Sequence, residues 1–106
     1  MIMKKAATAD EREYMGLAGR LSCAARGCMN YPVELHHPRR GAGMGRRASH
    51  FDVIPLCPGH HRTGGFGVAI HGGQKTWEAK FGTEAELTKK TQHLVEQLRK
   101  KSTGGV

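Results

Sequence analysis

Two short-spaced pairs of metal-ligating residues most constrain what this chain can fold into. Cys23 and Cys28 form a Cys-x4-Cys pair, and Cys57 and His60 form a Cys-x2-His pair later in the chain. A turn between two ligands aims both side chains at one point, and two such pairs complete a tetrahedral site. We therefore expect a structural zinc site. The alternative is three buried free cysteines that pack as small apolar residues.

Length and charge limit the architecture and the kind of partner. The 106 residues suffice for one domain, residues 1–106, and 15 glycines make a metal staple useful to so small a core. Seventeen Lys and Arg against nine Asp and Glu give a net charge of +8, which favours a polyanionic partner such as nucleic acid. Ribosomal proteins and proteins that bind acidic membranes share that charge balance. We find no long apolar run and no signal-peptide core, so we expect a cytoplasmic protein.

The pattern of apolar residues predicts an α+β fold. Thr8 and Glu11 match a capping box, and Trp77 and Phe81 are spaced for the buried face of a short helix rather than for stacking on a ligand. The expected helices cover residues 9–20, 74–81 and 83–100, and the expected strands cover residues 31–37 and 50–57. We expect residues 1–7 and 102–106 to be flexible.

Two histidine doublets stand at the ends of the expected strands. His36 and His37 end the first strand, and His60 and His61 follow the second. Neighbouring side chains on a strand point to opposite faces, so His36 and His37 must serve different surroundings. Once His60 is assigned to the zinc site, His36, His37, His61 and His71 remain to be explained.

Between the strands lies a glycine-rich basic loop, residues 38–49. We expect it to contact a nucleic-acid backbone with little base recognition, although a purely solubilising loop is the alternative. Its arginines are Arg39, Arg40, Arg46 and Arg47. Two further histidines, His50 and His93, we interpret as a loop residue and a helix-surface residue.

The strings ELHHPRR and FDVIPLCPGHH, followed by His71, resemble the HNH (His-Me finger) endonucleases. Within that superfamily the combination HHPR, PLCxxHH, a glycine-rich gap and IHGGQKTWEAKFG is most similar to the phage recombination-enhancement, Ref-like RecA-dependent nucleases. The resemblance covers residues 14–82. It implies a zinc-stapled ββα-metal core with flanking helices, DNA as substrate, and a RecA-type filament as partner.

The resemblance also implies roles for single residues. His37 would be the general base, and His36, His61 and His71 would hold one catalytic divalent metal, Mg²⁺, Mn²⁺, Zn²⁺ or Ni²⁺. Asp52 stands where relatives carry Asn, and it would hydrogen-bond the second ring nitrogen of His37; its alternative role is that of a turn residue at the strand end.

Two other functions fit the same residues. One is a non-catalytic zinc-bound nucleic-acid-binding module, in which both doublets serve metals and the arginines supply affinity. The other is a small phage structural protein stapled by zinc, which would leave the doublet His36–His37 unexplained.

Overall fold

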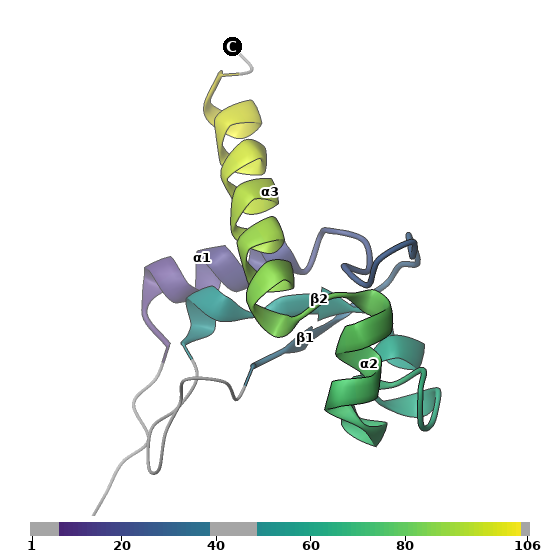
Figure 1. Cartoon of the computed structure of the whole chain (residues 1–106). Helices are drawn as coiled ribbons and strands as arrows, with labels where there is room; N and C mark the ends of the chain where they lie inside the picture. The colour runs from purple at the N-terminus through teal and green to yellow at the C-terminus, as the bar shows by residue number, and fades with distance from the viewer. Residues whose placement is uncertain (1–6, 39–48, 105–106) are drawn as a thin grey trace, which may run out of the picture.

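A two-stranded antiparallel hairpin lies at the centre of three helices in the computed structural model, which describes residues 7–38 and 49–104 (Figure 1). The predicted α+β class is confirmed. The helices are α1 (Ala9–Ala18), α2 (Gln74–Phe81) and α3 (Glu84–Gly104), and the strands are β1 (Glu34–His36) and β2 (Ile54–Leu56). No helix among the described residues is long and apolar enough to cross a membrane.

The strands are shorter than the sequence pattern predicts. β1 pairs with β2 in the register Glu34–Leu56, Leu35–Pro55 and His36–Ile54. The expected strand start at residues 50–52 is wrong, because this segment forms a 3₁₀ turn, η1 (His50–Asp52). The Ser49 hydroxyl caps that turn by accepting a hydrogen bond from the Phe51 amide at 3.0 Å, and such local side-chain bonds compete with strand pairing.

The two faces of the hairpin bury different sets of residues. Alternation places His36 on one face and Leu35 on the other. The first face carries the larger core, formed with α2, the start of α3 and the cysteine loop: Cys23, Ala24, Ala25, Ile54, Leu56, Cys57, Ile70, Trp77 and Leu87. The second face, with Leu35, packs near a smaller core of α1 and α3: Tyr14, Ala18, Val53 and Val95. The hairpin is therefore a thin layer with packed side chains on both sides.

The helices follow their sequence signals closely. Thr8 and Glu11 form the predicted capping box of α1, with each side chain accepting a hydrogen bond from the other residue's amide. Trp77 is fully buried in α2, and Phe81 packs against the same core, as predicted. α3 continues to Gly104, and the expected flexibility of residues 102–106 stays a prediction.

A wide π turn, η2 (Gly59–Thr63), follows β2 and carries the second histidine doublet. The amide of Gly64 closes this turn by donating to the Gly59 carbonyl at 3.0 Å. A β-carbon at Gly64 would lie 2.5 Å from both that carbonyl oxygen and Val68 Cγ1. The turn therefore requires glycine at this position for reasons of space.

We predict that Gly64→Ala destabilises the protein by about 1–3 kcal/mol, because the added methyl group must displace backbone and packed side chain. The matched control is Gly16→Ala in α1, where nothing lies within 4 Å of the added carbon; it should stabilise the protein by about 0.5–1 kcal/mol through helix propensity. Chemical denaturation of both variants measures the two free energies. Equal stabilities for the two variants would contradict this description of the turn.

Candidate metal centres and active site

The four residues of the two sequence pairs come together at one end of the hairpin. Cys23 and Cys28 flank the loop after α1, Cys57 directly follows β2, and His60 lies on η2. Their ligand atoms all lie within 4.8 Å of one another. The Nδ1 atom of His60 is 3.3 Å from Cys57 Sγ and 3.6 Å from Cys23 Sγ. This cysteine cluster could hold one metal ion.

The chemistry of the donor set fits a thiolate-bound cation. Burial raises the pKa of the Cys23 thiol to about 12, so this group ionises at neutral pH only if a positive charge is beside it. Burial also acts to raise the pKa of Cys57, but hydrogen bonds from the His60 amide, Cys23 and Asn30 outweigh it and the pKa is lowered. The Asn30 amide donates to Cys28 Sγ at 3.5 Å. Four protein ligands leave no open position, as in a structural zinc site.

A second group of ligands forms on the face of β1 that carries His36. The ligand atoms of His36, His61 and His71 all lie within 4.8 Å of one another. The Nε2 atoms of His61 and His71 are 3.0 Å apart, and the His36 ring centroid lies 5.3 Å from that of His61. The structure thus brings together the three histidines predicted for a catalytic metal. We call them the three-histidine group.

Glu34 orients His61 from the outer side of this group. It lies two residues before His36 on the same face of β1, and its Oε1 atom is 2.8 Å from His61 Nδ1. The Arg62 guanidinium holds the same carboxylate through both oxygens, at 2.9 and 2.7 Å. Hydrogen bonds from Arg62 and His61 lower the pKa of Glu34 to about 2. A carboxylate on Nδ1 leaves the Nε2 lone pair of His61 available to a cation.

Glu84 supports His36 in the same way, from the start of α3. This carboxylate is 1% exposed, and its Oε2 atom lies 2.7 Å from His36 Nε2. Gln74 donates a further hydrogen bond to Oε1 at 3.1 Å. Burial lowers the pKa of His36, while Glu84 acts to raise it. The sequence analysis missed both Glu34 and Glu84. The spacing of Glu34 and His36 in ELHH was a usable signal for the first, whereas nothing local indicated the second.

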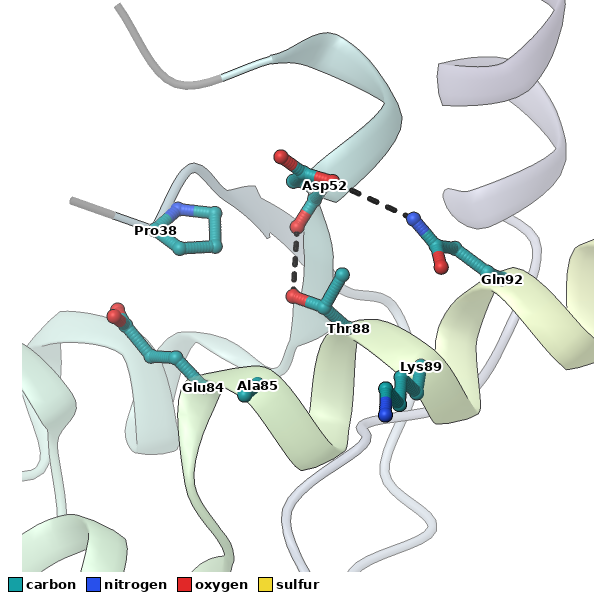
Figure 2. A pocket seen from close by; sticks show the side chains of 7 residues that line it. All are labelled: Pro38, Asp52, Glu84, Ala85, Thr88, Lys89 and Gln92. Carbon is teal, nitrogen blue, oxygen red and sulfur yellow. Dashed lines mark hydrogen bonds between the residues drawn. The ribbon is translucent and has the colours of Figure 1, made fainter. Parts of the chain in front are cut away.

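His37 points away from the three-histidine group and is exposed. Its Nε2 atom lies 3.0 Å from His50 Nδ1, so His50 is more than the simple loop residue that we expected. Desolvation and the nearby His50 lower the pKa of His37. The predicted Asp52 contact is not what the described residues show: Asp52 Oδ1 accepts a hydrogen bond from Gln92 at 3.4 Å (Figure 2).

Two clefts border these side chains. One, of about 290 Å³, is lined by His36, Ile70, His71, Gly72, Gly73 and Gln74. The other, of about 300 Å³, lies between Pro38, Asp52 and the first turns of α3 (Figure 2). The arginines predicted to bind DNA, Arg39, Arg40, Arg46 and Arg47, lie outside the described residues, so their role stays a prediction.

We predict that the two groups of ligands bind metal independently and with different effects on stability. Cys57→Ser should lose the cation of the cysteine cluster and unfold at a markedly lower temperature, because that cation ties the cysteine loop to β2 and η2. His71→Ala should lose only the cation of the three-histidine group and keep its secondary structure. Elemental analysis after dialysis and thermal unfolding followed by circular dichroism test both expectations. Unchanged unfolding of Cys57→Ser would contradict a structural role.

The comparisons with known proteins agree with this geometry. Comparison with curated protein sequences found no match. Residues 7–97 match the family described as recombination enhancement, RecA-dependent nuclease, which covers most of the chain and both groups of metal ligands. The chain therefore belongs to the family of recombination-enhancement, RecA-dependent nucleases.

Proposed function

We propose that this protein is a metal-dependent endonuclease of the HNH (His-Me finger) type that hydrolyses DNA phosphodiester bonds. One observation carries the proposal: two adjacent histidines at the end of β1 point to different environments. His36 is buried and faces His61 and His71, whereas His37 is exposed and faces His50. A hydrolytic site needs both a cation next to the phosphate and a base free to meet water.

The two ligand groups suit different cations. Three thiols and one imidazole favour zinc in the cysteine cluster. Three imidazoles bind zinc, nickel, manganese or cobalt more tightly than magnesium. Magnesium can still act as the catalytic cation because it is abundant in the cell. Glu34 and Glu84 hold the rings of His61 and His36 in fixed orientations, which is how outer carboxylates strengthen imidazole ligands elsewhere.

In the proposed reaction His37 accepts a proton from the attacking water. Its lowered pKa keeps the ring neutral at pH 7, so one ring nitrogen has a lone pair that can take the proton. His36, His61 and His71 would hold a cation that would supply positive charge beside the phosphate. The water oxygen bonds to phosphorus, the bond to the 3′-oxygen breaks, and that oxygen takes a proton from solvent, leaving 5′-phosphate and 3′-hydroxyl ends.

Asp52 keeps a place in this proposal as a nearby carboxylate. It lines the same cleft as Pro38, the residue after His37, and so lies near the proposed base (Figure 2). His50 is the direct hydrogen-bonding partner of His37.

The biological setting follows from the family and the charge. Membership of a RecA-dependent family supports action on DNA together with a RecA-type recombinase filament. Phage recombination inside a bacterial cytoplasm is the setting that we propose for it. The net charge of +8 supports contact with the DNA backbone, and affinity should then fall steeply with salt.

We predict that His37→Ala lowers DNA cleavage by at least about 100-fold, the usual contribution of a general base. Metal content, folding and DNA affinity should stay unchanged because His37 belongs to neither ligand group. The assay uses plasmid and single-stranded DNA, with and without a recombinase filament, in Mg²⁺, Mn²⁺, Ni²⁺ or Zn²⁺. The control is His93→Ala on the exposed surface of α3, which should cleave normally.

Absence of cleavage by the unmodified protein in every condition would overturn this proposal. Intact DNA binding in those conditions would instead favour a non-catalytic zinc-bound nucleic-acid-binding module.

A further inference from the structure

An exposed aromatic residue stands beside the three-histidine group without serving the core. Phe66 is 66% exposed, although large apolar side chains are usually buried. Its ring lies against Gly73, where an added β-carbon would be only 3.7 Å from Phe66 Cε2. Gly73 in turn lines the 290 Å³ cleft together with His36 and His71. Phe66 therefore borders the cleft that holds two of the three candidate metal ligands.

The loop that carries Phe66 is tied to the fold by hydrogen bonds. The amides of Val68 and Ala69 donate to the Gly65 carbonyl at 3.1 and 2.8 Å. The Trp77 indole donates to the Val68 carbonyl at 2.9 Å, which anchors the loop to α2. Both glycines beside Phe66 have positive φ, 79° at Gly65 and 86° at Gly67. The backbone at Phe66 is thus held in place, so binding does not have to order this loop.

The chemistry of the cleft matches a DNA strand. None of the described residues that line it is acidic, and the one carboxylate bonded to its lining side chains, that of Glu84, is buried behind His36 and Gln74. It offers imidazoles from His36 and His71, an apolar wall from Ile70, and the Gln74 side chain. An aromatic face next to a phosphate-binding position is the arrangement by which proteins hold single-stranded nucleic acid, because every base has a face that can stack. Bases paired within a duplex are already stacked on their neighbours and are not free to do so.

We infer that the Phe66 ring and the adjoining cleft form a subsite for one unpaired nucleobase next to the cut phosphate. This inference rests on the proposed nuclease function and adds to it one residue, Phe66, that would contact a base beside the cut. Recognition is by stacking, so it is tolerant of base identity.

The test uses single-stranded DNA with 5-iodouracil, which crosslinks to aromatic side chains stacked on it. It is performed in the His37→Ala background, which should bind DNA without cutting it. Mass spectrometry should locate the crosslink at Phe66. Phe66→Leu, which keeps an apolar side chain but no ring, should weaken single-strand binding roughly 5- to 100-fold, and Phe66→Trp should restore it. Duplex binding should change little.

The matched control is Tyr31→Leu, since Tyr31 is 63% exposed and does not line the cleft. It should leave single-strand binding unchanged. Circular dichroism and metal content verify that each variant is folded and loaded.

Two results would overturn the subsite. One is a crosslink at another residue together with unchanged affinity of Phe66→Leu. The other is a Phe66→Leu defect seen only with a recombinase filament and not with bare DNA, which would assign the ring to a protein contact. Because crosslinking needs no cleavage, an inactive protein that crosslinks at Phe66 would refute the nuclease proposal and leave the base subsite supported.

Discussion

Residues 57–61 connect the hairpin to both groups of candidate metal ligands. Cys57 directly follows β2, and its carbonyl accepts a hydrogen bond from the His61 amide at 2.9 Å where the chain turns into η2. The turn then directs two consecutive imidazoles toward two different groups of ligands. His60 faces the cysteine cluster and His61 faces His36 and His71. A structural cation and a catalytic one would therefore be held by neighbouring residues of a single turn.

The hairpin has too little hydrogen bonding to be stable alone, since each strand has only three residues. Its stability comes from packing on both faces and from the ligands at its ends. Because the hairpin is stabilised in this way, the fold tolerates two polar histidines at the end of β1. His36 lies among buried groups with Glu84 beside it, and the Gly64 contact keeps η2 closed beneath His61.

Local signals in the sequence predicted most of the fold. Capping boxes at Thr8 and Thr83 and the spacing of Trp77 and Phe81 located the helices, because helix ends and faces depend on neighbours a few residues apart. Strand ends were predicted poorly, since the Ser49 cap competes with pairing. The cysteine cluster was predicted from residue spacing, whereas the three-histidine group was predicted from the family resemblance. The contact of Glu84 with His36 could not be predicted from local sequence, because the two residues are 48 positions apart. The same holds for the contact of His50 with His37, because the long loop separates them.

The central claim is that His60 and His61 belong to two separate cation sites, and cobalt(II) titration of metal-free protein tests it most directly. Thiolate-bound cobalt absorbs strongly in the near ultraviolet, whereas cobalt bound by imidazoles alone does not. The account predicts two cobalt ions per chain, of which only one produces the thiolate bands. Binding of a single ion, or thiolate bands that grow in proportion through both equivalents, would contradict it.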